Sequence, residues 1–125
     1  MSKNVLVIDD KPESQNVVKN YMNEIACHFY TTGDLVTGLK LFNENNINLI
    51  IFNLLAPIGN GIEFLQQIKR KRPDASIIAI TEDGKTKQIS LKKASLVDRF
   101  LCKSFSRSDL IETFNSIGYF IKTEL

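Results

Sequence analysis

The sequence predicts an α/β domain in which a parallel β-sheet has helices on both faces. Short apolar runs alternate with segments whose apolar residues recur at helical spacing, which is typical of βαβ units. The run Asn48–Asn53 is nearly continuous in leucine, isoleucine and phenylalanine, as expected for a strand buried on both faces. A chain of 125 residues can form one core, and no linker or repeat interrupts it. We therefore expect residues 1–125 to form a single domain.

Five strands and five helices account for this pattern. Each expected strand is an apolar run that polar or turn-forming residues close. The strands are expected at Asn4–Asp9, Cys27–Thr31, Asn48–Asn53, Ile77–Thr81 and Val97–Cys102.

Residues that favour helix ends indicate where the helices begin and stop. Pro12 suits a first helical turn, and Asp34 is placed to cap the second helix. Pro73 blocks continuation of the third helix, and Ser106, with an acidic residue three positions later, begins a capping box for the fifth. The fourth helix, about Thr86–Ser95, has the weakest pattern because it is short and polar. The residues expected on the apolar helix faces are Val17, Val18, Tyr21, Met22 and Ile25; Leu35, Leu39 and Phe42; Ile62, Phe64, Leu65 and Ile68; and Leu110, Ile111, Phe114 and Ile117.

Composition argues against several classes of protein. The content of 43% hydrophobic and 24% charged residues is ordinary for a globular domain, and the net charge of +2 is too small to indicate nucleic-acid binding. No apolar run approaches the ~20 residues of a membrane span, and the N-terminus lacks a signal-peptide pattern. Cys27 and Cys102 have no metal-ligand spacing and fall on opposite edge strands, beyond the reach of a disulfide. We expect a cytoplasmic protein with reduced cysteines, no nucleic-acid partner and no membrane contact.

Polar residues stand where the expected strands end. Asp9 and Asp10 end the first strand, Asn53 the third and Thr81 the fourth, and Lys103 follows the fifth. The carboxyl ends of parallel strands share one edge of the sheet, and in the order 2-1-3-4-5 the first and third strands flank the topological switch point. We therefore expect these five side chains to converge.

These strand ends, together with Pro57 and Gly61 in the loop after Asn53, resemble the acidic pocket of two-component response regulator receiver domains. The resemblance covers essentially the whole chain and implies a flavodoxin-like doubly wound sheet. In receivers, an acidic pair holds Mg²⁺, the aspartate that ends the third strand is phosphorylated, and a hydroxyl residue and a lysine bind the phosphoryl oxygens. Phe100, three positions before Lys103, matches the aromatic switch position of the family.

Matched to the family, Asp9 and Asp10 correspond to the acidic pair, Asn53 to the phosphoacceptor, and Thr81 and Lys103 to the phosphoryl-binding residues. Their chemistry agrees with these roles, because Mg²⁺ prefers oxygen ligands and lysine supplies a positive charge. A carboxylate can form an acyl phosphate, but an asparagine amide cannot be the nucleophile. The amide can offer an oxygen to a cation or donate to a nearby carboxylate. We expect no required cofactor and a weak or vacant Mg²⁺ site at Asp9, Asp10 and Asn53.

Two further residues depart from the receiver pattern beside the same pocket. Ser104 follows Lys103, where receivers usually have a proline, so we expect a trans peptide bond and a different loop. Glu82 follows Thr81, where the family favours a small residue, and its carboxylate would repel a phosphoryl group.

We therefore interpret the chain as a stand-alone degenerate receiver, or pseudo-receiver, that signals through protein–protein contact and is not an enzyme. The expected partner is a histidine kinase or a downstream effector. The expected surface is the family's usual output face, built from helix four, strand five and helix five, with Lys92, Lys93 and Phe100.

Two other functions stay open at this point. The chain could be a phospho-competent response regulator in which asparagine replaces the acceptor aspartate at position 53. It could also be an enzyme or nucleotide binder on the same fold, but it lacks a glycine-rich phosphate loop and has only one histidine, His28.

Plainer structural explanations are open for the individual residues. Asp9 and Asp10 could form a solvated turn with a helix cap, and Asn53 could simply hold a loop. Phe100 could be a half-buried edge aromatic. The basic run Lys69–Arg72 favours the dipole of the helix that it ends, which indicates a solvated face rather than a nucleic-acid surface.

Overall fold

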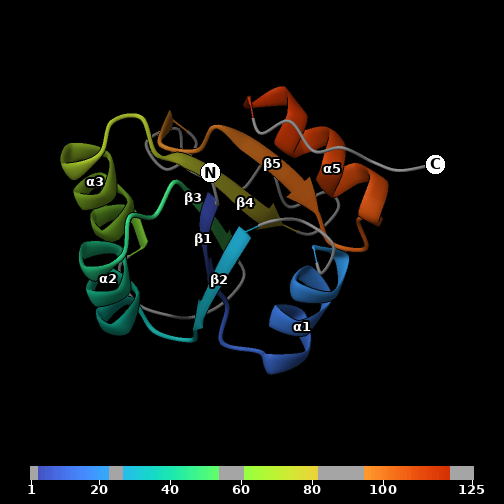
Figure 1. The fold of residues 1–125 in the computed structure, drawn as a ribbon, viewed down its shortest axis with the longest axis horizontal. Helices are drawn as coiled ribbons and strands as arrows, with labels where there is room; N and C mark the ends of the chain where they lie inside the picture. The colour runs from blue at the N-terminus through green and yellow to red at the C-terminus, as the bar shows by residue number, and fades with distance from the viewer. Residues whose placement is uncertain (1–2, 23–26, 54–60, 82–94, 119–125) are drawn as a thin grey trace.

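The computed structural model describes residues 3–22, 27–53, 61–81 and 95–118. Its centre is a five-stranded parallel sheet with the strand order β2-β1-β3-β4-β5 (Figure 1). This is the doubly wound order that the sequence predicts, so the predicted fold class is confirmed. The strands are β1 (Lys3–Ile8), β2 (Cys27–Thr32), β3 (Leu49–Asn53), β4 (Ser76–Thr81) and β5 (Arg99–Cys102).

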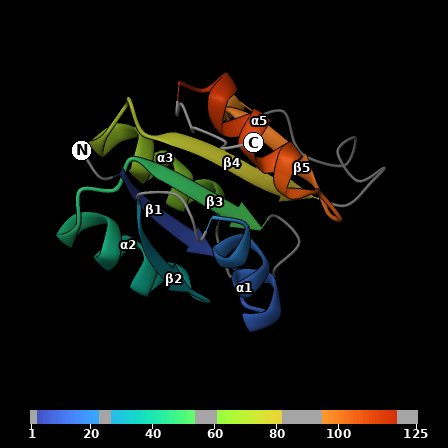
Figure 2. The same ribbon diagram turned by 45° about the vertical axis from the view of Figure 1, so that its right-hand side comes forward.

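Helices cover both faces of the sheet. α1 and α5 lie on one face, and α2 and α3 lie on the other (Figures 1 and 2). The helix expected at about Thr86–Ser95 falls almost entirely on residues 82–94, which lie outside the described part of the chain. The described helices are α1 (Pro12–Tyr21), α2 (Leu35–Glu44), α3 (Gly61–Lys71) and α5 (Arg107–Ser116).

Alternation along the strands builds an apolar layer on each face of the sheet. In β1, Val5 and Val7 pack toward α1 and α5, whereas Leu6 and Ile8 pack toward α2 and α3. All five residues of β3 are buried, as the sequence predicts for a central strand. Within the described residues, the expected helical faces are buried or half-buried except at Val17, which is 43% exposed beside the buried Val18; Ile25 lies outside the described residues.

The helix ends agree with the residues that the sequence singled out. Pro12 opens α1, and α3 ends at Lys71, two residues before the proline. The Asp34 side chain accepts the Thr37 N–H at 2.7 Å, and this bond lowers the pKa of Asp34. Ser106 begins a capping box in which its hydroxyl accepts the N–H of the acidic residue three positions later.

The basic run that ends α3 has a structural role that the sequence analysis missed. Lys69 Nζ donates to the Ala75 carbonyl at 2.7 Å and to the Asp98 carboxylate at 3.0 Å. The same carboxylate accepts the Ile77 N–H at 2.7 Å, and Arg72 donates to the Ile47 carbonyl at 2.6 Å. The interpretation as a purely solvated face is therefore wrong for two of the four cations, which fix the start of β4 against β5 and β3.

Cys27 and Cys102 lie on the two opposite edge strands, as expected. Within the described ranges, no helix has the length and apolar character that crossing a bilayer requires.

Candidate functional site

The strand register aligns the polar strand ends at one edge of the sheet. Ile8 pairs with Phe52, and Asn53 pairs with Ile80. Asp9 therefore follows β1 beside Asn53, and Thr81 follows one position beyond Ile80 at the end of β4. Figure 2 shows the arrows of β1 and β3 ending side by side. The topology thus brings residues that are far apart in the sequence to one edge.

Asp9 is the centre of a complete hydrogen-bond network. The residue is 2% exposed, and its backbone N–H donates to the Thr32 carbonyl at 3.0 Å. The Gln15 side chain donates to the Asp9 carbonyl at 2.6 Å, and the Lys11 N–H donates to Oδ1 at 2.9 Å. Asn53 Nδ2 donates to the other carboxylate oxygen, Oδ2, at 3.0 Å. Every polar group of Asp9 is therefore bonded within the protein.

This network is a poor match to a magnesium site. Mg²⁺ requires oxygen ligands, but Asn53 directs its nitrogen toward Asp9, and the reversed amide would set two oxygens against each other. Asp10 is exposed, and the described residues contain no group of three or more histidine, cysteine or acidic side chains that could hold a metal ion. A cation that bound Asp9 through Oδ2 would share that oxygen with the Asn53 N–H and would lie close to this positive end of the amide. We therefore derive no chemistry through a metal.

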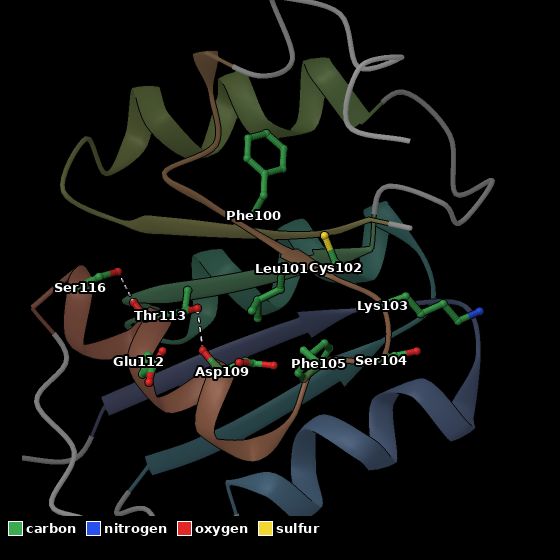
Figure 3. Close-up of a pocket in the computed structure, with 10 residues that line it drawn as sticks. All are labelled: Phe100, Leu101, Cys102, Lys103, Ser104, Phe105, Asp109, Glu112, Thr113 and Ser116. Atoms are coloured by element: carbon green, nitrogen blue, oxygen red, sulfur yellow. Dashed lines mark hydrogen bonds between the residues drawn. The ribbon is translucent and has the colours of Figure 1, made fainter. Parts of the chain in front are cut away.

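A backbone hydrogen bond joins Thr81 and Lys103 at the same edge of the sheet. Thr81 is 1% exposed, and its carbonyl accepts the Lys103 N–H. The Lys103 side chain is exposed and extends away from α5 (Figure 3). In the described part of the chain it forms no ion pair with Asp9 or Asp10. The structure therefore joins Asp9 and Asn53 directly, while the roles of Thr81 and Lys103 stay predictions.

The loop after Lys103 has an unusual backbone conformation. The described residues contain no cis peptide bond, so the Lys103–Ser104 bond is trans, as the sequence analysis expects. Ser104 has φ of 76°, and it is the one described residue other than glycine with a positive φ. This left-handed region disfavours side chains with a Cβ and excludes proline, whose φ is near −65°. The sequence signal for this loop was the serine in place of the family's proline.

A groove lies between β5 and α5 (Figure 3). Its volume is about 530 Å³. Phe100 is half-buried, and its ring lies on the side of β5 that faces away from α5. The sequence analysis placed the output surface here but did not single out Glu112 or Thr113. The lining residues are Phe100, Leu101, Cys102, Lys103, Ser104, Phe105, Asp109, Glu112, Thr113 and Ser116.

Comparison with known proteins gives the same family as the resemblance of the strand-end residues. The family model of the response regulator receiver domain matches residues 5–115. The sensor kinase/phosphatase LuxN of Vibrio campbellii is 24% identical over 72% of this chain, which spans 11% of LuxN. The chemotaxis protein CheY of Halobacterium salinarum is 22% identical, and the match covers 94% of this chain and 98% of CheY.

Among solved structures, the response regulator TrrA of Thermotoga maritima, in complex with Mg²⁺ and BeF, is similar in fold and sequence. It superposes with a TM-score of 0.78 and 28% identity, over 92% of this chain and 98% of TrrA. The fold of this chain is therefore a receiver fold over almost its whole length.

Proposed function

This chain belongs to the response regulator receiver domain family, and we propose that it acts in signalling through protein–protein contact, without phosphorylation at position 53. The observation that carries the proposal is the hydrogen bond from Asn53 Nδ2 to Asp9 Oδ2 at 3.0 Å. It couples a residue that cannot accept a phosphoryl group to the carboxylate that would otherwise attract a cation.

The chemistry of the pocket supports this proposal. An acyl phosphate forms on a carboxylate, and the nitrogen of an amide has a delocalised lone pair that does not attack phosphorus. Asp9 is buried, with both carboxylate oxygens bonded, so it is not a substitute nucleophile. Asp10 is exposed and lies two residues beyond the end of β1. In this proposal the chain is a binding module and not an enzyme.

We propose a signalling protein as the partner, either a histidine kinase or a downstream effector. The names of the relatives support this class, since LuxN is a sensor kinase/phosphatase and CheY is a chemotaxis protein. The proposed surface contains β5 and α5. The expected fourth helix, with Lys92 and Lys93, belongs to the same surface by the family resemblance and lies outside the described residues.

Mg²⁺ should bind weakly in this proposal. TrrA is a relative that was solved with Mg²⁺ and BeF, so the same titration of both proteins is a direct comparison. Amide NMR of this chain should show little change at low-millimolar Mg²⁺, because the cation must share Asp9 Oδ2 with the Asn53 N–H and meets one carboxylate fewer. Saturation at tens of micromolar would contradict the weak site.

Intact-mass analysis after treatment with acetyl phosphate tests the main claim. The expected result is no added phosphate on the unsubstituted chain, with a phospho-competent receiver as the positive control. Asn53→Asp should be phosphorylated slowly, and adding Glu82→Ala should speed the reaction by removing a repelling charge. Phosphate on the unsubstituted chain in the Asp9–Asn53 region overturns the proposal. Rapid and complete phosphorylation of Asn53→Asp alone would favour a competent regulator whose acceptor was replaced by asparagine.

A further inference from the structure

On the α5 side of the β5–α5 groove, the side-chain hydroxyls donate to carbonyls of the helix itself, so the free groups are hydrogen-bond acceptors. The Thr113 hydroxyl donates to the Asp109 carbonyl at 2.8 Å, and the Ser116 hydroxyl donates to the Thr113 carbonyl at 2.7 Å (Figure 3). Arg99 Nε then donates to the Ser116 hydroxyl at 3.1 Å. The wall therefore offers the Glu112 carboxylate, the Asp109 oxygen that the Ser106 N–H does not use, and hydroxyl lone pairs, so a matching ligand must be a donor.

The same wall carries the negative charge of two carboxylates, one of which also caps the helix, since Asp109 Oδ2 accepts the Ser106 N–H at 2.9 Å. Asp109 and Glu112 are exposed and three positions apart, so they lie on one face of α5. Neither forms an ion pair within the described ranges. Lys103 is the one cation of the lining, and its side chain extends away from α5 (Figure 3). The groove is thus acidic although the chain has a net charge of +2.

The floor of the groove is apolar. Leu101 is 5% exposed, and Phe105 is half-buried, with its ring in edge contact with Tyr21 at 5.8 Å between centroids. A long side chain can pack its methylene stem on such a floor while its charged head reaches the carboxylates.

Both ends of α5 are held in place, so the groove is preformed. At the C-terminal end, Arg99 Nη2 donates to the Ser116 carbonyl at 3.3 Å. At the N-terminal end, Arg107 Nε donates to the Tyr21 carbonyl of α1 at 3.1 Å, and the capping box fixes the first turn. A wall that is already ordered lowers the entropy cost of binding.

We infer that the β5–α5 groove binds an arginine side chain of the partner protein. Its guanidinium lies against Asp109 and Glu112, and its stem lies on Leu101 and Phe105. Arginine fits this wall better than lysine because its planar head presents five N–H donors and forms bidentate bonds with carboxylates. The acidic wall repels phosphates, so the occupant is a protein segment rather than a nucleic acid. This inference rests on the proposed function, because it gives the chemistry of the partner at the proposed surface.

Three synthetic peptides test the inference with the whole chain. Their sequence is acetyl-Ala-Leu-Xaa-Leu-Ala-amide, with arginine, glutamine or glutamate at the central position. Amide NMR titration should show shifts at the groove residues with the arginine peptide, about fivefold weaker binding of the glutamine peptide, and no binding of the glutamate peptide. Glu112→Gln should weaken the arginine peptide about fivefold. Glu44→Gln removes the same charge from exposed α2 and should leave the affinity unchanged.

The results separate the two proposals. Arginine-peptide shifts away from the groove, equal affinity for all three peptides, or equal effects of Glu112→Gln and Glu44→Gln overturn the inference. None of these outcomes changes the acetyl-phosphate result, on which the absence of phosphorylation depends. Conversely, phosphorylation of the natural sequence would overturn that function while the peptide titration still reported on the groove.

Discussion

The acidic pocket and the β5–α5 groove both contain carboxylates, but in opposite states. Asp9 is 2% exposed and accepts N–H bonds on both oxygens, whereas Glu112 is exposed and has no ion pair among the described residues. A bonded, buried carboxylate holds the fold together, and an exposed carboxylate is available to a partner. The difference supports the proposal that the Asp9 carboxylate is structural and that the carboxylate of the groove is available to a partner.

Removing the Asp9 carboxylate is expected to have the largest effect on stability. Asp9→Ala leaves the buried Asn53 amide and the Lys11 N–H without their acceptor, so the free energy of unfolding should fall by about 3 kcal/mol. Asp10→Ala is the matched control: Asp10 is the exposed neighbour of Asp9, and its replacement should lower the free energy of unfolding by less than about 0.5 kcal/mol. Urea denaturation measures both. Equal losses would show that the pocket network has no special structural role.

An acidic residue at position 53 should remove the hydrogen bond that joins this position to Asp9. Asn53→Asp replaces a donor 3.0 Å from Asp9 Oδ2 with a negative oxygen, so at pH 7 without metal we expect a loss of about 2 kcal/mol. Repulsion raises the pKa of at least one of the two carboxyls in the folded state. The loss is therefore complete above that raised pKa and disappears as the pH falls below the ordinary value of ~3.9. Mg²⁺ should recover part of it by binding only the folded state.

Thermal melts with and without Mg²⁺, at neutral and acidic pH, check this prediction. Asn48→Asp is the matched control, since Asn48 Oδ1 already accepts the Asn4 N–H at 3.1 Å and an aspartate keeps that acceptor. It adds the same charge away from the pocket, so Mg²⁺ should not rescue it. Rescue of both variants would mean that Mg²⁺ acts through general screening.

The loop between the two regions gives a third test. Ser104 lines the groove, and the preceding Lys103 N–H bonds to the Thr81 carbonyl at the pocket edge. Ser104→Pro restores the family's residue, but proline cannot adopt φ of 76°, so we expect a loss of about 1–2 kcal/mol. Ser104→Gly should instead be neutral or stabilise by up to about 1 kcal/mol. Denaturant midpoints with unchanged slopes would confirm the opposite signs.

Local patterns explain why the fold could be predicted from the sequence. The apolar runs, Pro12 and the cap at Ser106 act over a few residues, and the structure confirms them. Strand order was expected from the alternation of strands and helices in a doubly wound fold, the meeting of the polar strand ends followed from that order, and the amide chemistry of Asn53 allowed its bond to Asp9. Helical periodicity did not show which of the two adjacent valines faces the core. Val17 and Val18 are neighbours on α1, and only Val18 is buried.

Features that depend on long-range contacts could not be predicted. Lys69 bonds to Asp98 only because the end of α3 lies beside the residue that precedes β5, and the run of charges in the sequence does not predict that bond. The Gln15 contact with the Asp9 carbonyl and the positive φ of Ser104 likewise depend on how loops close over the sheet. The direction of the Lys103 side chain depends on a rotamer at the surface, which no spacing rule fixes.

The prediction with the smallest expected effect tests whether hydrogen bonding or burial accounts for the different roles of the Asp9 and Glu112 carboxylates. Asp34 is exposed like Glu112 but bonded like Asp9, and the Thr37 N–H lowers its pKa. A lowered pKa contributes stability above the unfolded value, and that stability is lost as the pH falls through the folded value. Asp34→Asn keeps a capping acceptor that does not titrate, so its stability relative to the natural chain should rise as the pH falls from about 7 to about 3. Salt should shrink the difference because the site is exposed. Urea denaturation of both proteins over this pH range measures the difference in stability. A difference that does not change with pH would mean that the hydrogen bond at the exposed Asp34 does not stabilise its ionised form. Burial, rather than hydrogen bonding, would then explain why the Asp9 carboxylate is structural.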